Sequence, residues 1–251
     1  MELSDFYPSP SDLIKSELAV LNHLRTDSYI KETHSQFARH ASAYYDRNRD
    51  GHSRGFEFVS YFDVWHAAMR RQKQGSGKQG KRTPNVRLLL AVRIKLDKRA
   101  FSNVTYCLTV CRIRSARITI LRKFHFDVTG GTDKSERRLQ QHPRSHLQYC
   151  GEMVPQMASM GCRETQLDQM HPWLSEPRIF FWPMSLALLI DMALHEFPDD
   201  RSKKFRASSE WRGLVRKQEA LVLRPFYQKC VDVIVDTRGK NQTLADEFYV
   251  G

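Results

Sequence analysis

Three stretches of alternating apolar and polar residues in the middle of the chain constrain the fold most. Apolar residues take every second position from Val86 to Leu96 and again from Val104 to Val110, and a third stretch has Ile118, Ile120, Phe124 and Phe126 in the same pattern, interrupted at Arg122. Such alternation is typical of strands that bury one face. Asp97–Ser102 and Arg114–Ala116 are short connections, so the sequence predicts an antiparallel meander of three strands or more.

Helices are predicted on the N-terminal side of this meander. Pro10 to about Leu24 carries an apolar stripe at helical spacing, and Ser9 precedes it as a candidate cap. A second, more polar helix is expected from Ser28 to Tyr45. Phe56 to Met69 is rich in aromatic residues and fits a strand or a helix equally well.

Further helices are predicted on the C-terminal side. Pro143 is expected to begin a short helix that ends near Gly151. An apolar helix should run from Pro183 to about Phe197, and a last one from Glu210 to about Val235. Ser208 or Ser209 would cap the last helix, and Pro225 would kink it. We therefore expect an α+β fold, with the meander packed against N-terminal and C-terminal helices.

The 251 residues suit a single domain with four parts. These are a helical part (1–70), a flexible basic loop (71–84), the meander with a histidine-rich segment (85–152), and a second helical part (153–251). The longest apolar stretch, Ile179 to Leu194, is shorter than the ~20 residues that cross a bilayer. Met1 to Pro10 lacks the pattern of an export signal, and the five cysteines form no C-x-x-C pair. We expect a cytoplasmic protein with reduced thiols and no membrane contact.

The positive charge is concentrated in one region. Residues 70–123 hold 16 Lys and Arg and one acid, Asp97, whereas the rest of the chain has a net charge of −3. Localised positive charge attracts polyanions, so we expect nucleic-acid binding, with RNA favoured over DNA. An acidic protein partner and a basic face kept for solubility are the alternatives. The candidate nucleic-acid-binding residues are Lys78, Lys81, Arg82, Arg87, Arg93, Lys95, Arg122 and Lys123.

The segment that follows is the richest in potential catalytic groups. His125 and Asp127 alternate on one strand, and His142 and His146 are four residues apart at the start of the expected short helix. Two histidines beside phosphate-binding cations can act as base and acid in phosphodiester cleavage. Without a metal, the 2′-hydroxyl of RNA must supply the nucleophile, so the hypothesis is a ribonuclease. Its candidate catalytic residues are His125, Asp127, His142, Arg144 and His146.

Two other combinations of residues contain groups that could bind a metal or act in catalysis. His142, His146, Cys150 and Cys162 have donor atoms for zinc, but their spacing matches no standard finger, so no metal or other cofactor is expected. Asp191 and His195 are four residues apart on the apolar helix and are more typical of a structural pair. The chain has no P-loop, G-x-G-x-x-G, H-E-x-x-H or G-x-S-x-G motif. Their absence argues against nucleotide hydrolases, dinucleotide enzymes, zincins and typical serine hydrolases.

A non-enzymatic role remains as the alternative function. In it, the chain is a subunit of a nucleoprotein or protein complex and binds a polyanionic partner through the basic sheet face. The helix from Pro183 to Phe197 and the long C-terminal helix would then supply the protein contacts, and the first of them is also the candidate contact for a second copy. The face from Met184 to Leu194 is expected first of all to be core.

Overall fold

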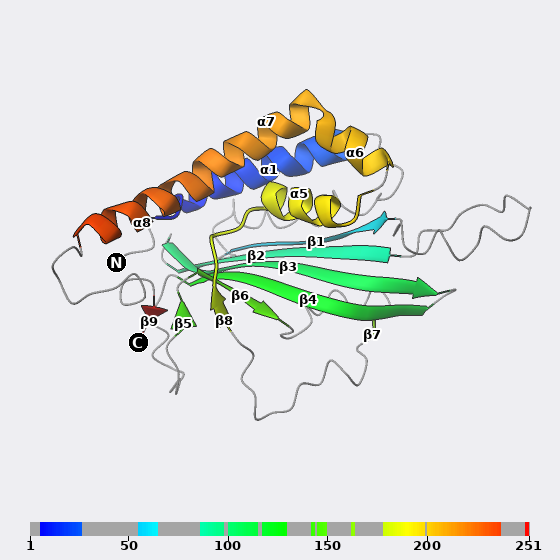
Figure 1. The fold of residues 1–251 in the computed structure, drawn as a ribbon, viewed down its shortest axis with the longest axis horizontal. Helices are drawn as coiled ribbons and strands as arrows, with labels where there is room; N and C mark the ends of the chain where they lie inside the picture. Colours follow the sequence, from blue (N-terminus) through cyan, green and yellow to red (C-terminus); the bar gives the residue numbers. More distant parts are fainter. Residues whose placement is uncertain are drawn as a thin grey trace, which may run out of the picture.

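A four-stranded antiparallel meander forms the centre of the fold (Figure 1). Its strands lie side by side in chain order, which confirms the α+β prediction, and the aromatic-rich segment supplies the first of them. The strands are β1 (Gly55–Val64), β2 (Val86–Asp97), β3 (Ala100–Arg114) and β4 (Arg117–Thr129). The computed structural model describes residues 6–26, 55–64, 86–97, 100–114, 117–129, 142–143, 145–149, 162–163, 178–198, 200–236 and 249–250.

Several predictions fall outside these residues. They are the helix at Ser28–Tyr45, the loop that carries Lys78, Lys81 and Arg82, and the positions of Arg144 and Cys150.

Short strands extend the meander beyond β4. β6 (Ser145–Tyr149) pairs with β4 and β8 (Arg178–Phe180) with β6, while β7 (Cys162–Arg163) runs parallel to β4. β5 (His142–Pro143) and β9 (Tyr249–Val250) form a separate two-stranded sheet. The prediction of a short helix from Pro143 to Gly151 is therefore wrong. Pairing with β4 gives the backbone of Ser145–Tyr149 its hydrogen-bond partners and sets Leu147 opposite the core residue Phe126.

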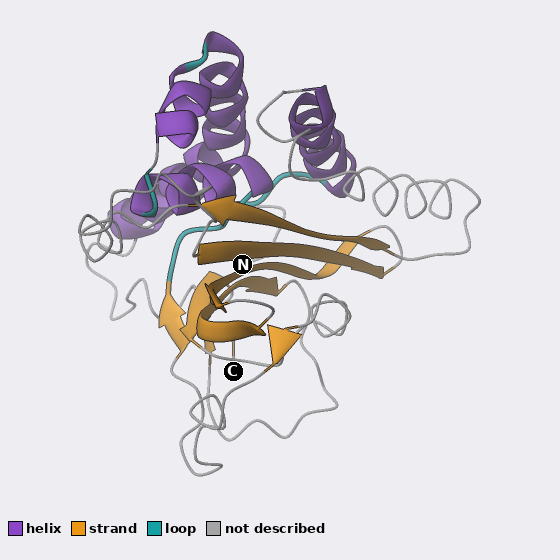
Figure 2. Ribbon diagram, turned by 90° about the vertical axis from the view of Figure 1, so that its right-hand side faces the viewer, coloured by secondary structure: helices purple, strands orange, loops and turns teal. Residues whose placement is uncertain are grey.

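The helices form one layer on one side of the sheet (Figure 2). Between them and the sheet lies the apolar core, which includes Leu88, Leu90 and Val92 of β2. The helical elements are α1 (Pro10–Thr26), α5 (Leu186–Glu196), α6 (Asp200–Ala207), α7 (Ser209–Gln218), the π-helical turn η4 (Glu219–Leu223) and α8 (Arg224–Asp236). No helix in the described part of the chain is long and apolar enough to cross a bilayer.

The helix α1 confirms its sequence prediction. Ser9 Oγ accepts a hydrogen bond from the Asp12 N–H at 3.2 Å, which satisfies one of the unpaired donors of the first turn. Leu13, Leu21 and Leu24 of the predicted stripe are buried in the core.

The apolar helix α5 is also confirmed, with a later start than expected. It begins at Leu186 because Ser185, not Pro183, is at the cap, where its side chain accepts from the Leu188 N–H. Six of its eleven residues are buried, and they come from the face that we predicted as core. It ends at Glu196, before Pro198.

The last predicted helix is interrupted where the sequence indicated. Ser208 is the cap of α7, and its Oγ accepts from the Trp211 N–H at 3.2 Å. The turn η4 precedes Pro225, and the Arg224 N–H bonds the carbonyl of Glu219, five residues earlier. A proline has no N–H and crowds the carbonyl four residues before it, so a wider turn relieves the clash. The helix α6 was not anticipated; it lies between Pro198 and Ser208.

A β-bulge changes the alternation of β4. Arg122 lies opposite Val110 and Ile120 opposite Cys111, so Leu121 is the extra residue between them. One extra residue reverses the inside–outside pattern beyond it. The sequence pattern put Ile120 on the same face as Phe124 and Phe126, and the bulge moves it to the opposite one.

A buried carboxylate connects three elements within the core. Glu17 of α1 is fully buried, and its Oε1 accepts from the Tyr106 hydroxyl of β3 at 2.6 Å. The Leu186 N–H at the start of α5 donates to both carboxylate oxygens, at 3.1 and 3.2 Å. Burial raises the pKa of Glu17 to about 7, although both hydrogen bonds act in the opposite direction.

Candidate nucleic-acid interface

The sheet face turned away from the helices carries five of the candidate residues that the structure describes. Since Leu88, Leu90 and Val92 enter the core under the helices, the residues between them point to the other side. Arg87 and Arg93 of β2 belong to this second face, as do Lys123, His125 and Asp127 of β4. We call it the polar sheet face.

One row across the polar sheet face joins four neighbouring strands. The register sets Arg93 opposite Thr105, Thr105 opposite Asp127, and Asp127 opposite position 146 of β6, which is histidine. The Thr105 hydroxyl donates to Asp127 Oδ1 at 2.5 Å, which fixes the orientation of the carboxylate. A cation, a carboxylate and a histidine position therefore lie in one line across the sheet.

A second row lies beside the first and contains the other candidate histidine. His125 is opposite Cys107 on one side and Gln148 on the other. Burial raises the pKa of the Cys107 thiol, and so does the charge of Asp127, whereas Arg93 and Lys123 act to lower it. Three charged groups of this face therefore act on one buried thiol of the second row.

Access to the polar sheet face is uneven. Thr109 and Lys123 are buried, and Lys123 is only 4% exposed. Arg93, Thr105, His125 and Asp127 are half-buried. The first row therefore keeps part of its surface exposed, whereas the side chain of Lys123 has almost none.

Three further candidates from the sequence lie outside these two rows. His142 pairs with Val250 in the small second sheet, so His142 and His146 share no helix. Lys95 belongs to β2, where its position is opposite Asn103. Arg122 is exposed and lies opposite the core residue Val110, so the alternation of the strand puts it on the other side of the sheet from Lys123.

The zinc alternative and the Asp191–His195 pair can also be placed. Cys162 belongs to β7, where it pairs with Ile118, and within the described ranges no three metal-binding side chains come together. Asp191 bonds Arg206 and Trp211, while His195 is exposed on the same helix. Burial acts to raise the pKa of Asp191, but those hydrogen bonds outweigh it and hold the pKa below its usual value.

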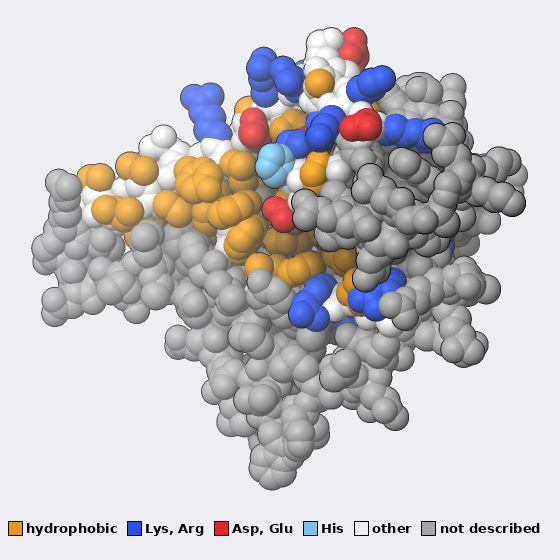
Figure 3. All heavy atoms as spheres, turned by 45° about the vertical axis from the view of Figure 1, so that its right-hand side comes forward, with side chains coloured by type: hydrophobic (Ala, Val, Ile, Leu, Met, Phe, Trp, Pro, Cys, Tyr) orange, Lys and Arg blue, Asp and Glu red, His pale blue; other side chains and the backbone are white. Residues whose placement is uncertain are grey.

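One basic surface escaped the sequence analysis. Residues 200–224, on α6, α7 and the start of α8, hold eight Lys and Arg against three Asp and Glu. Acidic segments elsewhere in the chain offset this excess, so the net charge outside residues 70–123 is only −3 and does not reveal it. A local window of about 25 residues would have found it. Figure 3 shows Lys and Arg side chains gathered over the helical layer.

Comparison with known proteins adds no relative: no protein-family model, curated protein or solved structure matches the chain.

Proposed function

We propose that the protein binds RNA on the polar sheet face and cleaves it there without a metal. The observation that carries this proposal is the row of Arg93, Thr105, Asp127 and His146, with His125 in the row beside it. The net charge of +12 favours a polyanionic ligand.

The chemistry needs one base and one acid, and the proposal assigns these roles to His146, whose position is in this row, and His125, in the row beside it. One histidine removes the proton from the 2′-hydroxyl, whose oxygen attacks the adjacent phosphorus. The bond from phosphorus to the 5′-oxygen breaks, and the other histidine donates the proton that this leaving group needs. The products are a 2′,3′-cyclic phosphate and a 5′-hydroxyl.

The charged neighbours have supporting roles in this proposal. Arg93 is half-buried and is the cation that contacts the phosphate, whereas the buried Lys123 adds positive potential beneath it. Asp127 lies opposite His146 and is suited to orient the imidazole, as carboxylates commonly do. The proposal assigns no role in catalysis to the other two candidates, Arg144 and His142.

The test is RNA cleavage by the variant His125→Ala, with His195→Ala as the matched control. His195 is exposed on α5, on the helix side of the sheet. We expect His125→Ala to slow cleavage by at least about 100-fold with binding kept within a few-fold, because general acid–base catalysis contributes that much. The variant His146→Ala should behave in the same way, and His195→Ala should match the unmodified protein.

Two results would contradict the proposal. One is cleavage that survives in both His125→Ala and His146→Ala. The other is cleavage of an RNA whose 2′-hydroxyl at the scissile position has been replaced by hydrogen, because the nucleophile would then be absent.

A subunit role is the second candidate, and an exposed apolar strip on α8 favours it. Tyr227, Val231, Ile234 and Val235 are each about half-exposed, and their spacing puts them on one side of the helix. A protein that binds RNA with the salt dependence of backbone contacts, but never cleaves it, would fit this role and not the ribonuclease.

A further inference from the structure

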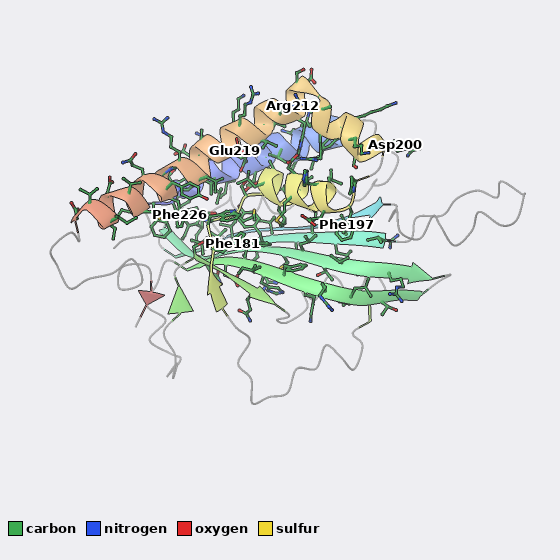
Figure 4. All side chains as sticks on the ribbon, viewed as in Figure 1. Phe181, Phe197, Asp200, Arg212, Glu219 and Phe226 are labelled. Carbon is green, nitrogen blue, oxygen red and sulfur yellow. The ribbon has the colours of Figure 1, made fainter. Side chains whose placement is uncertain are left out.

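A basic pocket in the helical layer is independent of the polar sheet face. It has a volume of about 360 Å³ and lies where α6, α7 and η4 meet α5. Figure 4 labels Arg212 on α7 and Glu219 at the start of η4, two of the residues that line it. Its charged lining residues are Asp191, Lys203, Arg206, Arg212, Arg216 and Glu219.

Two of these charges already neutralise each other. Arg206 binds Asp191 through two parallel hydrogen bonds, Nε to Oδ1 at 2.9 Å and Nη2 to Oδ2 at 3.0 Å. The Trp211 indole N–H also donates to Asp191 Oδ1, at 2.9 Å. The remaining charges in the lining are three cations, Lys203, Arg212 and Arg216, and one carboxylate, Glu219. The pocket therefore has an excess of positive charge.

The same contacts hold the wall of the pocket in place. The Arg206–Asp191–Trp211 cluster joins three helices, and Trp211 is fully buried. The Arg206 carbonyl accepts from Arg212 Nε at 3.4 Å, which leaves the outer nitrogens of Arg212 for a ligand. A planar guanidinium can bind two oxygens of one phosphate through two of its nitrogens.

We propose that this pocket binds a phosphate dianion, either as inorganic phosphate or as the terminal group of a phosphate monoester. A carboxylate would balance one positive charge, whereas a phosphate dianion balances two and offers oxygens to Lys203, Arg212 and Arg216 together. The volume is within the range of small-ligand pockets. The sheet separates this pocket from the polar sheet face, so the inference goes beyond RNA cleavage.

The test is calorimetric titration of the full chain with inorganic phosphate at low ionic strength. We expect saturable binding of phosphate. The double variant Lys203→Ala/Arg216→Ala should weaken this affinity by at least about tenfold, because it removes two charge-assisted hydrogen bonds to the ligand. The matched control is Lys204→Ala/Lys217→Ala, which removes the same charge from the adjacent exposed positions on the same helices. We expect it to change Kd by less than about twofold, and Arg216→Ala alone to give an intermediate loss.

Two further arms separate the sources of the phosphate. Tighter binding of a nucleoside monophosphate than of inorganic phosphate identifies the ligand as a monoester, and the reverse order identifies it as the free ion. A single-stranded RNA without terminal phosphates should not compete for the pocket. The variant Arg93→Ala should leave phosphate binding unchanged while it weakens RNA binding, which distinguishes a failure here from a failure of the ribonuclease proposal.

Three outcomes overturn the inference. They are no saturable binding of either phosphate compound, an equal loss of affinity in the pocket variant and its control, and displacement of phosphate by the RNA without terminal phosphates.

Discussion

At the scale of single residues, burial changes the protonation of Glu17. It has no exposed surface, and its partners are the Tyr106 hydroxyl and the Leu186 N–H. The start of a helix favours a negative charge, yet removal of the carboxylate from water costs more and raises its pKa to about 7. The protonated carboxyl keeps an acceptor for both donors, so it suits this site at lower pH.

The raised pKa of Glu17 predicts how the free energy of unfolding depends on pH. The folded state binds a proton that the unfolded chain, with an ordinary carboxyl, releases between about pH 4.5 and 7. The contribution of Glu17 is therefore fully present below pH 4.5 and is lost as the pH rises through 7, by about 3 kcal/mol. In urea denaturation, Glu17→Gln should flatten this part of the pH profile. Glu196→Gln, an exposed carboxylate on α5, should leave it unchanged, and equal slopes in all three proteins would contradict the argument.

At the scale of elements, caps and proline decide where the C-terminal helices begin and change. Ser208 and Ser209 both suit a cap by sequence, and the structure distinguishes them. Ser208 has an extended backbone and accepts from the Trp211 N–H, whereas Ser209 is the first residue of α7 and is exposed. The cap also holds Trp211, whose indole N–H binds Asp191.

The two serines provide a matched pair of variants. We expect Ser208→Ala to lower the free energy of unfolding by about 1 kcal/mol, because it removes the acceptor for an otherwise unpaired N–H. We expect Ser209→Ala to change it by less than about 0.5 kcal/mol, as for most exposed substitutions. Thermal and urea denaturation measure both values. A larger loss in Ser209→Ala would mean that the helix begins one residue later than the structure has it.

At the scale of the whole molecule, the sheet divides the charged surfaces into two groups. Arg93 lies on the polar sheet face, and Arg216 lies on the helical layer that covers the opposite face (Figure 2). If RNA binds the polar sheet face as proposed, it should release counterions only from that side of the sheet.

The salt dependence of RNA binding tests this division. Each phosphate contact contributes about 0.7 to the slope of log affinity against log salt for a single strand. Arg93→Ala should lower the slope by about one contact and weaken binding similarly for different sequences. Arg216→Ala should leave the slope unchanged within error. Equal effects of the two variants would show that RNA covers both sides of the sheet.

The sequence by itself determined the elements whose patterns are local. The alternation from Val86 to Leu96 predicts a half-buried strand, and the stripe on α1 and the apolar run of α5 predict buried helix faces. These predictions are correct because side-chain periodicity and helix caps depend only on residues a few positions apart in the sequence.

Only the tertiary structure decided what depends on pairing between distant segments. Ser145–Tyr149 is a strand because β4 offers an edge to it, and the bulge at Leu121 follows from the register with β3. The line from Arg93 to His146 and the pocket between α6 and α7 bring together residues that no spacing in the sequence relates. The physical reason is that backbone pairing and the burial of charge are settled by non-local contacts, whose partners a single segment does not specify.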